Sequence, residues 1–265
     1  MAGKAGNTDA NSVFKHETLT VNGIKTVVMT AGQGDPLVFF HGGGVFSGFD
    51  FALPWTERYK VYIPFHPGFG DSGDDPEIAD MHDYVLHYLE LFDQLKLERG
   101  LRLVGFSMGG WMAAEFAMEH RRRLHKLVLV APAGLRVKEY PGTDLFRIPP
   151  EQVPAYLVHD LKVIERYLPK EPDADFLTAR YREMTTIARF AWEHPYSQRL
   201  ARWLHRINVP TLMVWGEQDR LVPHQQSASW AKLIAGAQVQ TFKNAGHLVL
   251  DEKPEAVKAV ADFLA

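Results

Sequence analysis

Hydrophobic positions along this chain fall into two kinds of segment that alternate. Short, continuous apolar runs are typical of strands that are buried on both faces of a parallel sheet. Such runs occur in PLVFFHGGG, YKVYIPFHPGFG, GLRLVGFSMGG and HKLVLVAPAG. Between them, apolar side chains recur at helical spacing over Met81 to Leu97 and over Trp111 to Leu124. Strands that alternate with amphipathic helices predict right-handed crossovers and a doubly wound sheet.

The pattern changes at both ends of this core and in its middle. Asn22-Gly23 separates two strand-like segments and predicts a tight hairpin. After Ala133 the alternation stops, and the stretch from Tyr140 to about Arg206 carries seven prolines and helical pieces without a buried strand. The alternation of strands and helices resumes at VPTLMVWGEQDRLVP, which is followed by the segments SASWAKLIAG, AQVQTFKNAGH and PEAVKAVADFLA. We therefore predict a core of residues 13–136 and 207–265, a helical cap inserted at 137–206, and a flexible leader at 1–12.

Composition narrows the class of protein. Of 265 residues, 46% are hydrophobic and 23% charged, which is ordinary usage for a globular protein. The formal charge of -3 offers no basic field for nucleic acid, and the absence of cysteine excludes thiolate zinc sites and cysteine nucleophiles. The N-terminal stretch has no apolar signal-peptide core, and no later apolar run is long enough to span a membrane. We expect a cytoplasmic protein with no membrane or nucleic-acid partner.

The sharpest local motif is Gly105-Phe106-Ser107-Met108-Gly109, a G-x-S-x-G between a predicted strand and a predicted helix. A serine on such a tight turn has a strained backbone and needs small neighbours, and its hydroxyl projects above the sheet edge. The free amides and positive dipole end of the following helix favour negative charge at this point. The motif predicts a nucleophilic Ser107, and the alternative is a simple glycine-bounded loop.

A serine hydroxyl needs a base, and the base needs a group that fixes its tautomer. Asp219 and His247 both follow predicted strands, in the chain order Ser, Asp, His that this arrangement uses. The carboxyl ends of parallel strands share one edge of the sheet, so the three side chains are expected to meet there. Glu217 lies closer to its strand end and is the less favoured acid.

Five motifs in order make the chain resemble the α/β-hydrolase superfamily, especially its capped esterases, epoxide hydrolases and C-C bond hydrolases. They are HGGG, HPGFGDS, GFSMGG, WGEQDRLVP and AGH, and the resemblance covers about residues 17 to 265. It implies an α/β-hydrolase fold with a mostly parallel, eight-stranded, doubly wound sheet. It also implies an oxyanion hole formed by the backbone amides of Gly43 and Met108.

The resemblance also limits the chemistry. Epoxide hydrolases and haloalkane dehalogenases of this fold carry aspartate at the nucleophile position, whereas this chain has Ser107. We expect a serine hydrolase that cleaves a carboxylic ester, or a related acyl bond, of a small, largely apolar substrate. The alternatives are a C-C bond hydrolase of dienoic ring-cleavage products and a slow ligand-sensing receptor that retains the triad. Leu248 departs from the tryptophan that C-C hydrolases usually carry after the histidine.

Other features have simpler explanations. The literal G-x-G-x-x-G at residues 68–73 lacks a following helix, so a tight loop beside the pocket is favoured over dinucleotide binding. The nearest histidine pairs, His82 with His87 and His120 with His125, lack metal-site spacing and are expected on solvated helix faces. His41 is expected to bond loop backbone, and residues 121–123 to form a solvated helix end. We expect no cofactor and no metal. The sequence leaves open whether the protein forms a homodimer.

The predicted cap also holds candidates for binding a substrate. Its aromatic side chains either line an acyl or aryl pocket or pack the cap itself. Arg180, Arg182 and Arg189 are candidate partners for a substrate carboxylate.

Overall fold

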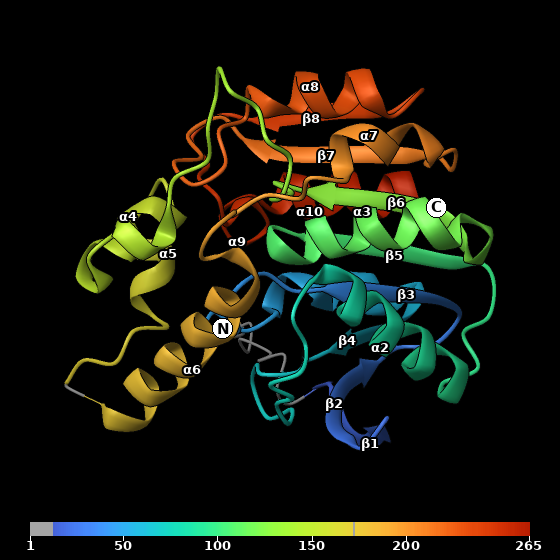
Figure 1. Ribbon diagram of the computed structural model, residues 1–265, viewed down its shortest axis with the longest axis horizontal. Helices are drawn as coiled ribbons and strands as arrows, with labels where there is room; N and C mark the ends of the chain where they lie inside the picture. Colours follow the sequence, from blue (N-terminus) through green and yellow to red (C-terminus); the bar gives the residue numbers. More distant parts are fainter. Residues whose placement is uncertain (1–12, 172) are drawn as a thin grey trace, which may run out of the picture.

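A single twisted sheet organises the chain, and Figure 1 shows its strands one above another, from β8 at the top to β1 at the bottom. The computed structural model describes residues 13–171 and 173–265, so the predicted leader at 1–12 lies outside the described residues. The strand order is β1-β2-β4-β3-β5-β6-β7-β8. Pairing is antiparallel from β1 to β2 and from β2 to β4, and parallel across the rest of the sheet. The strands are β1 (Lys15–Val21), β2 (Ile24–Ala31), β3 (Asp35–Phe40), β4 (Tyr59–Pro64), β5 (Leu101–Phe106), β6 (Leu124–Val130), β7 (Thr211–Gly216) and β8 (Gln238–Phe242).

This sheet confirms the predicted fold class. The apolar runs in the middle of the chain became β3, β4, β5, β6 and β7, whose inner positions are buried. The hairpin prediction is also confirmed, because Val21 pairs with Ile24 and the two turn residues Asn22 and Gly23 have φ of 47° and 82°. Positive φ at both positions is what a two-residue turn between twisted strands requires.

Helices cover both faces of the sheet and create two hydrophobic cores. On one face lie α2 (Met81–Gln94), α3 (Met108–His120), α7 (Leu200–Trp203) and α8 (Gln226–Leu233). On the other lie the 3-10 helix η1 (Asp50–Glu57), α9 (Val249–Glu252) and α10 (Pro254–Leu264). Fully buried tryptophans mark the two layers, with Trp230 in the first and Trp55 in the second. The central parallel strands are therefore shielded from water on both sides.

Two predicted helices differ from the structure at their ends. The helix expected to end at Leu97 stops at Gln94, and Lys96 takes a positive φ of 58° that no α-helix continues through. The helix expected from Trp111 starts at Met108, because the turn at Ser107 leads straight into it. It ends at His120, and residues Arg121–Arg123 form a 3-10 turn, η2.

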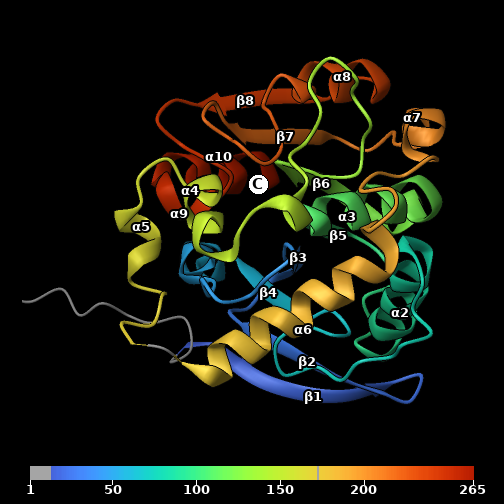
Figure 2. The same cartoon turned by 60° about the vertical axis from the view of Figure 1, so that its left-hand side comes forward.

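Between β6 and β7 the described residues form helices and turns. They are α4 (Val153–Leu157), α5 (Lys162–Glu165), α6 (Ala174–Ala191) and α7, with the 3-10 turns η3 (Leu145–Arg147), η4 (Pro150–Gln152) and η5 (Leu204–Arg206). Figure 2 shows α4, α5 and α6 grouped beside the sheet, at the edge toward which β6, β7 and β8 point in Figure 1. By contrast, α7 packs against α3. None of the described helices is long and apolar enough to cross a membrane.

The start of α3 packs so closely against the ends of β3 and β5 that positions 105 and 109 have no room for a side chain. A Cβ added to Gly105 would lie 2.4 Å from the carbonyl oxygen of Gly109, and one added to Gly109 would lie 2.2 Å from that of Phe40. Real Cβ atoms do not approach backbone oxygens this closely, so glycine at both positions is a steric requirement. The helix thereby reaches the carboxyl end of β3, which brings residues 107 and 108 beside the loop that follows Phe40.

We predict that Gly109→Ala will lower the free energy of unfolding by about 2 kcal/mol or more, because the added methyl group must push α3 away from β3. Urea titration followed by circular dichroism measures this change. Gly73→Ala is the matched control, since its added Cβ would have ordinary contacts of 3.4 to 3.5 Å. Equal losses in the two variants would contradict the packing argument.

Candidate active site

Ser107 occupies the turn between β5 and α3. Its backbone has φ 53° and ψ −115°, a conformation that a non-glycine residue adopts only under strain. Hydrogen bonds hold it there. Its N–H donates to Val130 O at 2.9 Å, and its carbonyl oxygen accepts from the amides of Trp111 and Ala133, both at 3.0 Å. The half-buried hydroxyl therefore stands at the carboxyl edge of the sheet, as the motif predicts.

Asp219 and His247 lie in contact beyond the ends of β7 and β8. The imidazole Nδ1 of His247 and the Oδ2 of Asp219 are 2.7 Å apart, and both side chains are buried. The other carboxylate oxygen, Oδ1, accepts from the amides of Leu221 at 2.8 Å and Val222 at 2.9 Å. Three donors thus surround the carboxyl group of Asp219, and as the acceptor for Nδ1 it fixes the proton of His247 on that nitrogen. This tautomer leaves Nε2 as the nitrogen that can accept a proton.

The neighbouring acid takes no part in this pair. Glu217 accepts a hydrogen bond from the Thr241 hydroxyl at 3.1 Å. Of the two carboxylates weighed from the sequence, the structure brings Asp219 to the histidine.

Phe106 is a site residue that the sequence analysis missed. Its ring lies 4.9 Å from the imidazole of His247, centroid to centroid, with the planes tilted by 46°. The available signal was an aromatic residue directly before the serine, where the turn directs it toward the same edge of the sheet. Phe106 thus packs against the imidazole and limits the space in which it can rotate.

Two cavities meet at Ser107 and His247. The larger has a volume of about 450 Å³ and the smaller about 260 Å³, and Gly43, Ser107 and His247 line both. The larger cavity continues between the start of α3, residues 133–146 and the end of α6, with Trp111, Phe190 and Tyr196 in its walls. The smaller one runs between η1, the loop at 41–49, α4 and the first half of α6. A substrate bound in either cavity would reach the same serine and histidine.

The two residues expected to form an oxyanion hole lie beside the serine. Met108 is the first residue of α3, where backbone amides have no partner within the helix. Gly43 lines both cavities, and a Cβ at this position would lie 2.8 Å from Cδ1 of Ile187. Glycine here leaves space for an atom that approaches its amide.

Two buried histidines support the loop that carries Gly43. A carbonyl oxygen can only accept, so Nδ1 of His41 donates to Gly42 O at 2.7 Å while its Nε2 accepts from the His66 amide at 3.1 Å. In turn, Nε2 of His66 donates to His41 O at 2.9 Å, and its Nδ1 contacts the Tyr88 hydroxyl. Burial lowers the pKa of His41 to about 3 and that of His66 well below its usual value. Both rings stay neutral and act as supports for the loop, as expected for His41.

The three candidate arginines on α6 have different surroundings. Arg189 pairs with Asp74 at 2.6 Å, and Arg182 donates to the carbonyl oxygen of Gly70, so both join α6 to the 68–75 loop. Arg180 lines the smaller cavity, where its Nη1 lies 2.8 Å from Oε2 of Glu183. Burial raises the pKa of Glu183 to about 7, although the guanidinium of Arg180 opposes this shift. Only Arg180 of the three is placed to meet a ligand.

Other predictions can be compared with the structure. Ser72, within the G-x-G-x-x-G segment, accepts from the Val27 amide at 2.9 Å and donates to Phe65 O at 2.8 Å, as expected of a structural loop. The expectation of a solvated His87 was wrong: it is 5% exposed and hydrogen-bonds Thr26 at 3.2 Å, because α2 turns this position toward the sheet. Among the described residues, no three acidic or histidine side chains are grouped as a metal site requires.

The chain belongs to the alpha/beta hydrolase fold family, whose sequence profile matches residues 35–254. It is similar to 2-hydroxy-6-oxo-2,4-heptadienoate hydrolase from Pseudomonas putida, at 27% identity over 92% of this chain and 94% of the relative. It is also similar to lipase 1 from Psychrobacter immobilis, at 28% identity over 87% of this chain and 78% of that protein.

A solved structure shows the same fold. A serine hydrolase involved in carbazole degradation superposes with a TM-score of 0.77, at 23% identity, over 95% of this chain and 99% of that one. The relatives thus include both dienoate hydrolases and lipases.

Asp251, a carboxyl group that lines the smaller cavity, generates a prediction about pH. Burial raises the pKa of Asp251 to about 8, well above that of a carboxyl in an unfolded chain. The native state therefore retains a proton that the unfolded state releases near pH 4, so stability falls as pH rises from about 4 to about 8.

We predict that Asp251→Asn will gain stability relative to the wild type across this range, by at most about 1.4 kcal/mol per pH unit. Urea unfolding at pH 5, 7 and 9 measures the difference. The exposed Glu255→Gln is the control and should show no such trend. A difference between Asp251→Asn and the wild type that stays constant with pH would contradict the prediction.

Proposed function

We propose that this protein is a serine hydrolase in which Ser107 is the nucleophile, His247 the general base and Asp219 the residue that orients the base. One observation carries the proposal. A buried His247–Asp219 hydrogen bond of 2.7 Å and a strained Ser107 at a strand-to-helix turn open onto the same two cavities. No purely structural role requires a strained serine and a tautomer-fixed histidine at the junction of two cavities.

The proposed reaction is acyl transfer through an acyl-serine intermediate. Nε2 of His247 takes the hydroxyl proton as Ser107 Oγ bonds to the substrate carbonyl carbon, and the carbonyl oxygen becomes an oxyanion. The amides of Gly43 and Met108 donate hydrogen bonds to this oxyanion. The imidazolium then returns its proton to the leaving alcohol as the ester bond breaks. Water, deprotonated by the same nitrogen, then attacks the acyl-serine. The imidazolium returns this proton to Ser107 Oγ as the acid leaves.

The cavities favour a small, largely apolar ester. Their walls consist mostly of aromatic and aliphatic side chains, and volumes of about 450 and 260 Å³ suit an acyl group and a leaving group of modest size. We propose that α4, α5 and α6 act as a cap, because these helices and their connections supply much of both cavity walls. Such a cap keeps bulk water from the acyl intermediate.

C-C bond cleavage is the second candidate function. The similarity to a 2-hydroxy-6-oxo-2,4-heptadienoate hydrolase favours it, as does Arg180 in the smaller cavity, since a guanidinium can bind a dienoate carboxylate. Two features oppose it. Arg180 is already paired with Glu183, and the residue after the catalytic histidine is Leu248. We therefore favour the ester hydrolase.

We predict that Ser107→Ala will abolish hydrolysis of nitrophenyl butyrate and covalent labelling by a fluorophosphonate. Asp219→Asn should lower kcat by about four orders of magnitude, because it allows the wrong tautomer of His247. Glu217→Gln is the matched control and should retain wild-type turnover. Steady-state rates and labelling followed by mass spectrometry measure these effects. Undiminished turnover by Ser107→Ala would disprove the proposal.

The choice between ester and C-C cleavage has its own test. We predict that kcat/KM for nitrophenyl butyrate will exceed that for a 2-hydroxy-6-oxo-dienoate by about tenfold or more, because Glu183 occupies the guanidinium that the dienoate carboxylate would need. Disappearance of the dienoate absorbance gives the second rate. The opposite ranking would favour the C-C hydrolase.

A further inference from the structure

Trp111 connects the serine turn to the wall of the larger cavity. Its amide donates to Ser107 O at 3.0 Å in the first turn of α3, and its indole lines the larger cavity. The ring of Phe190 from α6 meets the indole edge-on, with 6.1 Å between the ring centroids. The indole also lies against the backbone of Gly134, where a Cβ would come within 2.4 Å of the ring. A rotation of this indole would change the shape of the cavity.

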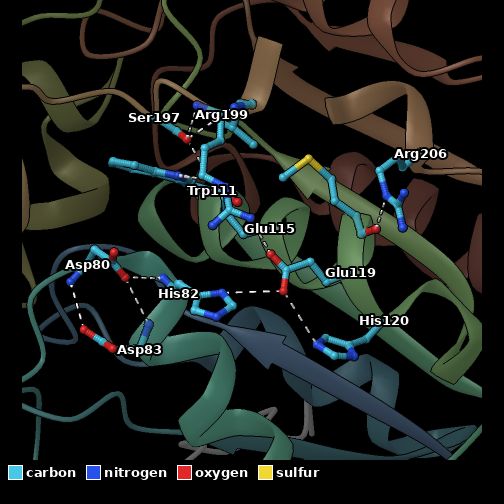
Figure 3. Close-up of polar contacts among 12 residues, drawn as sticks. Asp80, His82, Asp83, Trp111, Glu115, Glu119, His120, Ser197, Arg199 and Arg206 are labelled. Atoms are coloured by element: carbon cyan, nitrogen blue, oxygen red, sulfur yellow. Dashed lines mark hydrogen bonds and ion pairs between the residues drawn. The ribbon is translucent and has the colours of Figure 1, made fainter. Parts of the chain in front are cut away.

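Glu115 holds the polar edge of that indole. It lies one turn further along α3 and is 4% exposed. Its Oε1 accepts from Trp111 Nε1 at 3.3 Å and from the Ser197 hydroxyl at 2.8 Å, as Figure 3 shows. Burying a carboxyl group costs free energy unless hydrogen bonds satisfy it. Glu115 and its two donors, Trp111 and Ser197, therefore hold one another in position.

Ser197 belongs to the connection that returns from α6 to α7. Its amide donates to Gly134 O at 2.7 Å, and its hydroxyl oxygen accepts from the amides of Arg199 at 3.1 Å and Leu200 at 3.3 Å. Gly134 lies where the chain leaves β6 and enters the helical segment, and Ser197 lies near the end of that segment. The hydrogen bond between them therefore joins the two ends of the segment side by side. Glu115 joins this crossing point to Trp111.

A second carboxylate on the same helix provides a contrast. Glu119, one turn after Glu115, pairs with Arg199 at 2.6 Å and with His82 at 3.5 Å (Figure 3). In the pair with Arg199 the arginine side chain is 49% exposed. The pair therefore resembles a surface ion pair, which contributes little to the free energy of folding. Glu119 also anchors the 197–200 connection, but it does not contact the indole.

We propose that Glu115 is a positioning residue that sets the orientation of Trp111, and thereby the length of acyl group that the larger cavity accepts. The inference rests on the proposed function as far as it concerns acyl groups. Without the carboxylate, Trp111 Nε1 is a buried donor with no acceptor, and the indole turns toward another partner. The wall formed by Trp111, Phe190 and Gly134 then opens or closes.

The first experiment compares Glu115→Ala, Glu115→Gln and Glu119→Ala, using the ratio of kcat/KM for nitrophenyl decanoate to that for nitrophenyl acetate. We expect Glu115→Ala to change this ratio by about tenfold or more. Glu115→Gln should stay nearer the wild type, because its amide oxygen still accepts from the indole, and Glu119→Ala should keep the wild-type ratio. An unchanged ratio in Glu115→Ala, or an equal change in Glu119→Ala, would overturn the inference.

A double-mutant cycle with Trp111→Phe tests whether Glu115 acts through the indole. Phenylalanine has no N–H for Glu115 to hold, so adding Glu115→Ala to Trp111→Phe should change the ratio no further. A full additional effect would show that Glu115 acts by another route and would refute the proposal. If Glu115→Ala fails to fold, Ser197→Ala takes its place in the same cycle, because it removes the hydroxyl that donates to Glu115. An undiminished effect of Ser197→Ala in the Trp111→Phe background would also refute the proposal.

Binding without chemistry separates this inference from the proposed function. In Ser107→Ala protein, dissociation constants of hexanol and decanol measure the cavity by calorimetry. We expect Glu115→Ala to shift their ratio in the same direction as the kinetic ratio. If protein with Ser107 intact hydrolyses no ester while Glu115→Ala still shifts the ratio of dissociation constants, the hydrolase is refuted and the role of Glu115 is retained. An unshifted ratio would refute that role whatever the turnover.

Discussion

The close contact between the start of α3 and the carboxyl ends of β3 and β5 is the constraint on which the site depends. Glycines at 105 and 109 allow the helix to lie against backbone oxygens, where any side chain would collide with them. This contact forces the chain at Ser107 into a positive φ and brings Met108 beside the loop of Gly43. The strain at one residue is sustained because hydrogen bonds from β6, residue 133 and α3 itself surround it.

The acids and bases around this turn differ in how burial and hydrogen bonds act on them. Asp219 has two backbone amides and an imidazole as donors, which is the surrounding that an ionised carboxylate needs. At Asp251, in the same region, burial outweighs the nearby charge of Arg166 and raises the pKa to about 8. His41 and His66 show the reverse for bases, because burial lowers their pKa and leaves neutral rings that support a loop. Two aspartates in one site, Asp219 and Asp251, therefore differ in their hydrogen bonds and in how burial acts on them, and the buried histidines His41 and His66 support a loop.

The helical segment between β6 and β7 is tied to the core in two places, near α3 and at the loop of residues 68–75. Near α3, Glu115 and Ser197 fasten the point where the chain enters and leaves it. Further out, Arg182 and Arg189 on α6 bond the loop at 68–75, and Glu183 with Arg180 reaches the smaller cavity. Polar contacts thus tie the helices that form the cavity walls to the core, while mostly apolar side chains line the cavities. The apolar lining supports the apolar substrate that we propose.

Much of the fold followed from the sequence because its signals are local. Buried parallel strands need continuous apolar runs, the Asn22-Gly23 turn needs positive φ at two positions, and a serine between glycines marks the turn before α3. The order of the strands and the shared edge at their carboxyl ends then place Ser107, Asp219 and His247 near one another.

Contacts between residues far apart in the chain had no such signal. The choice of Asp219 over Glu217, the ring of Phe106 against His247 and the burial of His87 against Thr26 depend on how finished elements pack. The same holds for Glu115, whose partners lie one turn away on its helix and 82 residues away in the chain. Only the tertiary structure decided these pairings, because a side chain's partners and its exposure to water are set by the neighbours that folding brings to it.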